Sequence, residues 1–438
     1  MLGVDVEVII SKKMIGVTTP TMSTEVIVSE LMELIQSQIA GSVGESLSEK
    51  EERALAIGRR AAKLAMSEMI AIDPAEPQCT TCECGGIAVS KESRSRSMVT
   101  MAGTHMVSRR KYRCDKCGKW IVPRDDELGI GSGNYSVGVV SLAAEVSAGF
   151  AFEAGENFLA RHFGLDLCYK QVQRMAERTG AVVCEREYDL ALGVVSDKAA
   201  LICQEQPEML TISADGVMVH SDGAWTEMKC ASFGSEEYGR STIATMEACE
   251  KFGELLYLEA VRRGLRKADK VVFVADGAVW IWNLVSHHFP DAVEIVDWYH
   301  AVEHLWEVAN ASYGKGSKKA KDWIKRNKAR LMEDGVDRVI SSIKQWQPKT
   351  QDHIKIKREN LHYFTTNANR MLYATFKLNG YYIGSGSVES ACKQYGPGRL
   401  KGAGMRWKKP GIEAIAHLRS AVLNRRTPAI MEAAKIAA

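Results

Sequence analysis

Three short apolar runs in the second half of the chain each end at an aspartate. Asp215 follows Leu-Thr-Ile-Ser-Ala, Asp276 follows Val-Val-Phe-Val-Ala, and Asp297 follows Val-Glu-Ile-Val. Runs of this length are typical of buried strands, and helical periodicity between the second and third predicts a sheet covered by helices. Ligands of such sheets gather where the strands end. The pattern therefore predicts an α/β fold with carboxylates collected at one edge of a sheet.

The same aspartates carry a second signal. Glycine follows Asp215 and Asp276, and an Asp-Gly step alone is most often a turn or a helix cap. Two similar copies favour a cation-binding role, because carboxylates on neighbouring strands repel each other unless a cation lies between them. Paired carboxylates of this kind are what two-metal phosphoryl transfer requires.

A further carboxylate lies late in the chain, where Glu389 stands early in a predicted helix after a glycine-rich loop. Metal-binding carboxylates beside a cationic, aromatic-containing surface predict an enzyme that acts on a polyanion such as a nucleic acid. The candidate nucleic-acid-binding residues follow Glu389 and are Lys393, Arg399, Lys401, Arg406, Trp407, Lys408 and Lys409.

Two C-x-x-C pairs, Cys79 with Cys82 and Cys114 with Cys117, predict a structural zinc site. Four thiolates satisfy tetrahedral Zn²⁺, and the metal supplies folding energy that so small a segment lacks. Cys84, which two glycines follow, can replace Cys79 or Cys82. The basic residues between the pairs either form a solvated face of a zinc ribbon or contact phosphates, and the sequence favours neither.

Composition narrows the class of protein. The chain has 438 residues, of which 46% are hydrophobic and 25% charged, so a disordered or disulfide-stapled protein is excluded. Six of the 11 cysteines are scattered singly, which suits a reducing cytoplasm. No apolar run reaches the roughly 18 residues of a spanning helix, and we expect neither a signal peptide nor a membrane partner. A net charge of +3 says nothing about partners.

Periodicity and composition divide the chain into segments. We expect an N-terminal helical region at 1–74, the zinc ribbon at 75–125, a helical region at 126–207, the α/β domain at 208–300 and 380–411, an all-helical segment at 301–379, and a C-terminal helix and tail at 412–438. Within the region 126–207, residues 153–180 fit a DNA-binding helix-turn-helix and ordinary helix packing equally well.

Taken together, the motifs resemble those of the Kra-type insertion-sequence transposases, bacterial relatives of the Mutator superfamily. The resemblance rests on Asp215-Gly, Asp276-Gly-Ala-Val-Trp-Ile-Trp, Asp297-Trp-Tyr-His-Ala-Val-Glu-His-Leu-Trp, Gly384-Ser-Gly-Ser-Val-Glu-Ser and Gly404-Met-Arg-Trp, and it covers most of the chain from 79 to 424.

The resemblance implies an RNase H-like catalytic domain with an all-α insertion at 301–379. Its DDE triad would be Asp215 on the first strand, Asp276 after the fourth and Glu389 on a late helix. These three residues would bind two Mg²⁺ (or Mn²⁺) ions, in addition to the structural Zn²⁺ of the ribbon. Asp297 and His300 fit the superfamily's C/D-x-x-H signature as accessory residues. The implied activity is metal-dependent cleavage and strand transfer on double-stranded DNA, at element ends and target, by a dimer or larger assembly at the nucleoid.

Two other functions compete with this one. Residues 300–304 match H-x-x-E-H, in which His300 and His304 would bind zinc and Glu303 would act as the general base of a metallopeptidase. A non-catalytic DNA-binding regulator, built from the ribbon and helices, would leave the three carboxylates unexplained. Residues 315–330 hold eight basic side chains against Asp322, which fits a solvated helix face or a DNA-binding surface.

Overall fold

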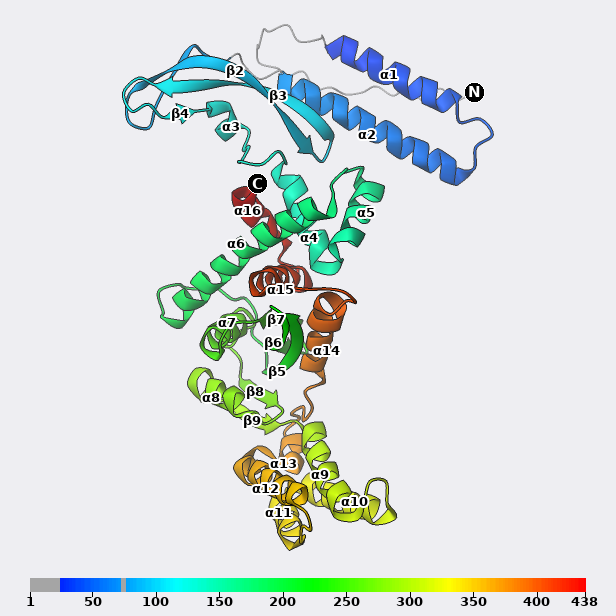
Figure 1. Cartoon of the computed structure of the whole chain (residues 1–438), viewed down its shortest axis with the longest axis vertical. Helices are drawn as coiled ribbons and strands as arrows, with labels where there is room; N and C mark the ends of the chain where they lie inside the picture. The colour runs from blue at the N-terminus through cyan, green and yellow to red at the C-terminus, as the bar shows by residue number, and fades with distance from the viewer. Residues whose placement is uncertain (1–23, 72–75) are drawn as a thin grey trace. The chain divides into compact units, whose positions relative to one another are not determined.

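The computed structural model describes residues 24–71 and 76–438, and the chain forms two compact units (Figure 1). The first unit comprises residues 1–139 with Ala438, and the second comprises residues 140–437. Over the described ranges, no helix is both long enough and apolar enough to cross a bilayer. Helices α1 (Thr24–Ala40) and α2 (Leu47–Ala71) open the first unit.

A four-stranded antiparallel sheet of order β1-β2-β3-β4 follows in the first unit. Its two central strands form a long hairpin, whose small core holds Ala88 and Tyr112 beside two cysteines. The Tyr112 hydroxyl donates to the carbonyl of Pro77 at 2.6 Å, which ties the start of the ribbon to its centre. The strands are β1 (Cys79–Thr81), β2 (Ile87–Thr100), β3 (Gly103–Cys114) and β4 (Trp120–Ile121), and α3 (Pro123–Glu127) follows them.

The second unit is built on a five-stranded mixed sheet of order β7-β6-β5-β8-β9. The first three strands along the chain pair antiparallel, whereas β5 with β8 and β8 with β9 pair parallel. The predicted strands at 270–275 and 293–296 are confirmed, and the sheet gains two strands that the sequence analysis missed. The bounds are β5 (Met209–Ser221), β6 (Ala224–Ser235), β7 (Gly239–Thr245), β8 (Lys270–Ala275) and β9 (Val293–Val296).

The two faces of this sheet pack against different helices. On β5, Leu210, Ile212 and Ala214 join one core with residues of α7 (Cys249–Arg262) and α8 (Val279–His288). Val219 belongs to the opposite face, where it packs with residues of α14 (Gly386–Tyr395). Successive side chains on a strand point to opposite faces, so Asp215 shares the α14 face with Val219.

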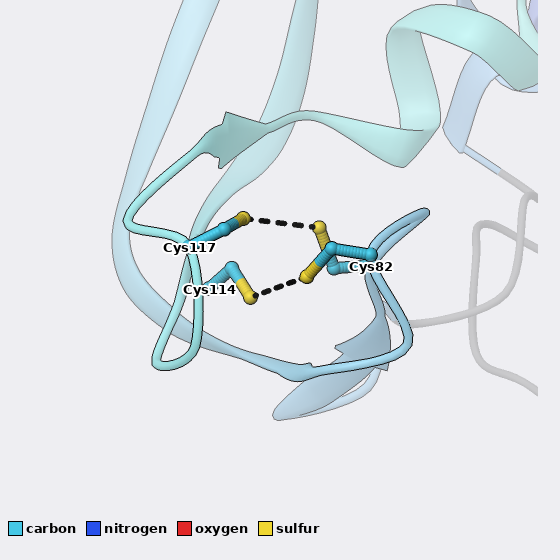
Figure 2. A group of neighbouring side chains, drawn as sticks. Cys82, Cys114 and Cys117 are labelled. Carbon is cyan, nitrogen blue, oxygen red and sulfur yellow. Dashed lines mark hydrogen bonds between the residues drawn. The ribbon is translucent and has the colours of Figure 1, made fainter.

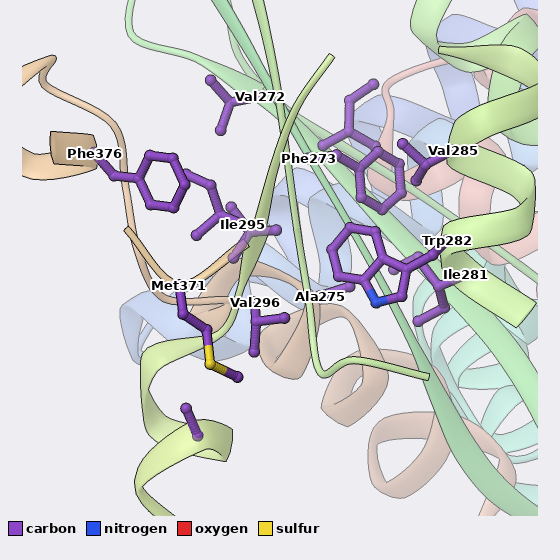
Figure 3. Packing of buried hydrophobic residues seen from close by; sticks show 14 of the residues in the cluster. Val272, Phe273, Ala275, Ile281, Trp282, Val285, Ile295, Val296, Met371 and Phe376 are labelled. Carbon is purple, nitrogen blue, oxygen red and sulfur yellow. The ribbon is translucent and has the colours of Figure 1, made fainter. Parts of the chain in front are cut away.

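Residues 301–379 form helices joined by short loops, without a strand, as predicted from their periodicity. This block packs against β8 and β9: Figure 3 shows Met371 and Phe376 on one side of these strands, with Trp282 and Val285 of α8 on the other. The Tyr373 hydroxyl donates to the Val296 carbonyl at 3.0 Å. The helices are α9 (Trp298–Tyr313), α10 (Lys318–Met332), α11 (Val336–Gln345), α12 (Gln351–Thr366), a short 3₁₀ turn (Ala368–Arg370) and α13 (Tyr373–Leu378).

Of the remaining helices, α15 contacts the edge strand β7, and α6 packs against α15, α16 and α5. Gly164, with a positive φ of 67°, ends α5 and lets the chain turn into α6. Residues 153–180 therefore do contain a helix, a turn at Gly164 and a second helix, and this second helix continues to Val195. The bounds are α4 (Val137–Gly149), α5 (Phe152–Phe163), α6 (Tyr169–Val195), α15 (Lys409–Leu423) and α16 (Thr427–Ala437).

Candidate active site and metal centre

The strand register places the three aspartates side by side. Ala214 pairs with Ala275, and Ala275 pairs with Val296, so the next residue of each strand is Asp215, Asp276 or Asp297. Neighbouring strands lie about 4.8 Å apart, and residues in register point to the same face. The expectation that these carboxylates gather at one edge of the sheet is therefore met.

Glu389 joins this edge from α14, the helix that contacts β5, β6 and β7. Burial raises the pKa of Asp215, and although the Gly216 N–H acts against this, the negative charges of Asp276 and Glu389 raise it further. Asp276 and Glu389 therefore both lie within electrostatic range of Asp215. Such crowding of carboxylates favours a bound cation.

Backbone donors fix one oxygen of each aspartate. The Gly216 N–H donates to Asp215 Oδ1 at 2.7 Å, and the Ala278 N–H donates to Asp276 Oδ1 at 2.9 Å. Asp215 Oδ2 faces the thiol of Cys392 at 4.0 Å, which is too long for a strong bond. The chain therefore orients both carboxylates and leaves oxygens of each for another ligand.

The backbone at Asp276 is held by the helical block. The Tyr363 hydroxyl donates to the Asp276 carbonyl at 3.0 Å. Gly277 has a φ of +106°, and a Cβ added there would lie 2.7 Å from the Tyr363 ring. Only glycine suits both the conformation and the space, so α12 directly supports the turn that presents Asp276.

Asp297 has a different role, because the chain already uses both of its oxygens. It is 1% exposed, its Oδ1 accepts from the His300 N–H at 2.8 Å, and its Oδ2 accepts from the Ser385 N–H. Burial raises the pKa of Asp297, but the bonds from His300 and Ser385 outweigh burial and hold the pKa below its usual value. Asp297 thus caps α9 and also ties this helix to the loop before Glu389.

His300 lies in the first turn of α9, with Nδ1 3.4 Å from Asp297 Oδ1. The contact with the Asp297 carboxylate raises the pKa of His300 to about 9, although burial acts in the opposite direction. His300 also lowers the pKa of Asp215 by its charge. The structure therefore places a cationic imidazole near the carboxylates, where the sequence predicted an accessory residue.

We expect Asp297→Ala to lower the free energy of unfolding by about 2–4 kcal/mol. The substitution removes a helix cap, worth about 1 kcal/mol, and leaves the buried Ser385 N–H without an acceptor, which costs about 1–3 kcal/mol. Urea-induced unfolding followed by circular dichroism measures the change. An unfolding midpoint equal to that of the unmodified chain would refute the double role of Asp297.

His300→Ala provides the comparison, because it leaves both backbone bonds to Asp297 in place. If His300 contacts DNA, this variant should slow cleavage while its free energy of unfolding stays within about 1 kcal/mol of the parent value. A destabilised His300→Ala protein in which all activities fall together would mean that His300 has only a structural role.

The side chains of the H-x-x-E-H match are engaged elsewhere. His304 Nδ1 lies 2.9 Å from Asn360 Oδ1, and its ring stacks on Tyr363 with centroids 3.7 Å apart. Across the described part of the chain, neither His300 nor His304 belongs to a group of three or more side chains close enough to share a metal ion. These contacts give the peptidase hypothesis no geometric support.

The ribbon cysteines do form such a group. The sulfur atoms of Cys82, Cys84, Cys114 and Cys117 all lie within 4.8 Å of one another. Figure 2 shows Cys82, Cys114 and Cys117 pointing toward a common centre. Cys82 lies 3.7 Å from Cys117 and Cys84 lies 3.6 Å from Cys114. Zinc–sulfur bonds of about 2.3 Å in a tetrahedron require about 3.8 Å between sulfurs, so the cluster fits Zn²⁺.

This geometry corrects the predicted ligand set at one position. Cys79 pairs with Val89 in the sheet and is not part of the group, whereas Cys84 is. The ligand pattern is thus C-x-C followed by C-x-x-C. The reason lies in the turn after Cys82: Gly85 has a φ of +76°, and a Cβ at Gly86 would lie 2.9 Å from Cys114 Sγ, so these glycines fold the chain against the second knuckle.

The thiols in the cluster affect one another strongly. Backbone N–H groups of Cys117 and Lys116 lower the pKa of Cys114 to about 6, despite some desolvation. The pKa of Cys84 is raised to about 12, because the thiols of Cys117 and Cys114 outweigh the N–H of Gly86. Thiols this close cannot all ionise unless a cation balances their charge, which is the situation that Zn²⁺ resolves.

Two of the predicted nucleic-acid-binding residues have buried side chains and are not part of an exposed basic surface. Arg399 is 3% exposed and Trp407 is 8% exposed. The Arg399 guanidinium lies against the rings of both Phe152 and Trp407, 4.9 and 5.2 Å from their centroids, and its Nε donates to the Ser147 carbonyl. Arg399 therefore joins α5 to the turn after α14. The other five remain exposed: Lys393, Lys401, Arg406, Lys408 and Lys409.

Basic residues also cluster on helix α10 and on the ribbon, but they differ in whether acidic side chains pair with them. Helix α10 exposes lysines along one side, and no ion pair is found for them among the described residues. In the ribbon, by contrast, several basic side chains are engaged: Arg109 pairs with Asp125, and Lys111 pairs with Glu92 at 3.0 Å. The exposed lysines of α10 are Lys318, Lys319, Lys321 and Lys325.

Three residues that shape the site were not predicted from the sequence. Cys392 was detectable, because it stands three residues after Glu389 on a predicted helix and so shares its face. Nothing local identifies Tyr363 or Ser385, which reach the carboxylates only through the tertiary fold. No protein-family model matches the chain, and no curated protein matches it.

Proposed function

We propose that this protein is a DDE-type DNA transposase with an RNase H-like catalytic domain, which cleaves the ends of an insertion sequence and joins them to target DNA. The observation that carries the proposal is the convergence of Asp215, Asp276 and Glu389 on one face of the sheet. Counted along the chain, β5 is the first strand of its sheet and β8 the fourth, which matches the positions that the resemblance gives to the two aspartates.

The donor set fits Mg²⁺ or Mn²⁺. These hard cations prefer carboxylate oxygens and water. Backbone N–H groups bind only one oxygen each of Asp215 and Asp276, so other carboxylate oxygens at the site can bind a cation. Asp215, Asp276 and Glu389 would hold these cations. When bound, two such ions would activate a water or 3′-hydroxyl and stabilise the leaving oxygen in displacement at phosphorus.

The chain's own residues position the reactants around this site. Asp297 holds the start of α9 against Ser385, directly before the helix that carries Glu389, and so would help the carboxylates keep their spacing. His300 places a cationic imidazole beside them, able to donate to a phosphate of the passing strand. The exposed basic residues after α14 and on α10 would hold the duplex backbone by charge.

The remaining parts have roles consistent with this function. The zinc ribbon and the N-terminal helices would bind or position DNA. Because two element ends must be handled, we expect a dimer or larger assembly on double-stranded DNA. The protein would then act at the nucleoid in the cytoplasm.

The direct experiment incubates the purified chain with DNA that carries the element ends, with Mg²⁺ or Mn²⁺, and maps the cut positions. Cuts at the element ends would support the proposal, and a protein that binds these ends without cutting would favour the regulator. Glu303→Gln separates the proposal from the peptidase: a peptidase would lose its general base, whereas a transposase should keep metal-dependent cleavage.

A salt titration should separate exposed from buried basic residues. We expect Lys401→Gln, Arg406→Gln and Lys408→Gln, combined in one chain, to weaken DNA binding. The slope of log affinity against log salt should fall by about 0.9 for each phosphate that the variant no longer neutralises. Arg399→Gln should instead lower thermal stability, because it removes a buried cation–π interaction from the core. Fluorescence anisotropy at several salt concentrations measures the slope.

A matched control keeps the same change in net charge. Lys349→Gln, Lys355→Gln and Lys377→Gln remove three exposed lysines from the helical block without touching the segment after α14. If both triple variants lower the slope equally, binding reports only total charge, and the segment after α14 is not a DNA-binding surface.

A further inference from the structure

A second group of potential metal ligands lies in the second unit, between helices α6 and α15. Cys184 extends from α6, and Glu413 and His417 extend from α15, where four-residue spacing puts them on one helix face. One ligand atom from each of the three residues lies within 4.8 Å of the other two. Glu413 and His417 are 7% and 5% exposed, so two of these polar groups lie inside the core.

A tight helix crossing brings the three side chains together. A Cβ added at Gly180 would collide with the backbone of Ala414, so the two helices approach until their main chains touch. Cys184 stands one turn after Gly180, and Glu413 directly precedes Ala414. Glycine at the crossing therefore fixes the position of the cysteine against the face that carries the carboxylate and the imidazole.

Hydrogen bonds hold the carboxylate of Glu413 in a fixed orientation, more closely at one oxygen than at the other. Its Oε1 accepts from the Met246 N–H and, at 3.0 Å, from the Thr245 hydroxyl. Its Oε2 receives weaker contacts, from Thr245 at 3.1 Å and from the Tyr188 hydroxyl at 3.3 Å. Such outer hydrogen bonds hold one oxygen and turn the other toward the ligand.

The distance between His417 and Glu413 does not suit a hydrogen bond. His417 Nε2 lies 3.5 Å from Glu413 Oε2, and this buried nitrogen has no hydrogen-bond partner among the described residues. A nitrogen–oxygen hydrogen bond measures about 2.7–3.2 Å. Metal–ligand bonds of about 2.0–2.2 Å in a tetrahedron require about 3.4 Å between a nitrogen and an oxygen ligand, which agrees with the observed distance.

We propose that Cys184, Glu413 and His417 form a second zinc site, which holds α6 and α15 together inside the second unit. A thiolate, a carboxylate and a neutral imidazole balance the charge of Zn²⁺, and the mixture of sulfur, nitrogen and oxygen ligands suits this ion. Three protein ligands leave one position of the tetrahedron, which a water molecule would complete. This site lies apart from the carboxylates of the proposed active site and does not depend on their function.

Metal analysis of the full-length protein tests the proposal. After equilibration with Zn²⁺ and removal of the free ion, elemental analysis should find about two zinc ions per chain, one in the ribbon and one at the second site. Cys184→Ser and His417→Gln should each reduce this to about one, while Cys249→Ser, a matched loss of a partly buried cysteine elsewhere, should leave it unchanged.

Cobalt provides a readout that does not depend on counting. In a chain whose ribbon ligands are replaced by Cys114→Ser and Cys117→Ser, Co²⁺ should still give the near-ultraviolet absorption of a cobalt–thiolate bond, and Cys184→Ser added to that chain should abolish it. If the protein holds a single zinc ion that Cys184→Ser does not affect, or if cobalt gives no thiolate band once the ribbon ligands are gone, the three residues form a metal-free polar cluster and the proposal is wrong.

Discussion

Asp215→Asn, Asp276→Asn and Glu389→Gln should each lower the rate of DNA cleavage by about 10³-fold or more. Each change removes the charge of a metal ligand and keeps the size of the side chain. Stabilisation of transition-state charge by bound metal is worth several kcal/mol, and each increment of about 1.36 kcal/mol corresponds to a factor of ten in rate. Single-turnover cleavage of DNA carrying the element ends, with Mg²⁺ in excess, measures the loss.

DNA binding distinguishes loss of chemistry from loss of fold. All three variants should bind the same DNA with nearly the affinity of the parent, because the exposed basic residues are unchanged. Asp197→Asn serves as the matched control, since this aspartate side chain is 89% exposed and its positive φ of 54° suits asparagine. Near-normal cleavage by any of the three variants would remove that residue from the site.

The carboxylates were predictable because they obey a local rule. Asp215, Asp276 and Asp297 each follow apolar residues in the sequence, and parallel strands bring such positions to one edge of a sheet. Glu389 was harder, since it follows no strand and was indicated only by its place early in a predicted helix after a glycine-rich loop. The structure adds what the sequence could not: Tyr363 and Ser385 support the site from positions 87 and 88 residues away in the chain from the aspartates they bind.

The two missed strands left a signal that the sequence analysis did not use. Asp222 and Gly223 both adopt positive φ values, 51° and 85°, and form the tight turn between β5 and β6. An Asp-Gly pair between alternating apolar residues is a strong indicator of a hairpin. Strand β6 was obscured because its first half is exposed and polar, whereas its second half is buried.

The errors in the cationic surface have a different origin. Arg399 and Trp407 stand among exposed basic residues in the sequence, and only the tertiary fold buries them against Phe152. A guanidinium that contacts two aromatic rings can keep its charge inside the core, so residue type alone predicted the wrong location. The neighbouring lysines meet the ordinary expectation and remain exposed.

Replacement of the ribbon ligands should have the second large effect. Cys114→Ser combined with Cys117→Ser should remove the ribbon zinc and unfold the segment around it, because structural zinc contributes about 10–16 kcal/mol of apparent binding energy in small zinc-folded domains. The core of the ribbon beyond the cysteines is small, with Ala88 and Tyr112 at its centre. Elemental analysis measures the metal, and hydrogen exchange of β2 and β3 measures the unfolding.

A pair of single variants tests the ligand set itself. Cys84→Ser should lose the ribbon zinc, whereas Cys79→Ser, the same substitution a few residues earlier, should retain it, because the Cys79 sulfur lies outside the group that surrounds the metal. Each variant is compared in zinc content and in the protection of β2 and β3, since misfolding alone would also abolish activity. The opposite result, with Cys79 required and Cys84 dispensable, would restore the two C-x-x-C pairs as the site. Undiminished total zinc in the Cys114 and Cys117 double variant would mean that no ribbon site exists and that the bound metal belongs to other ligands.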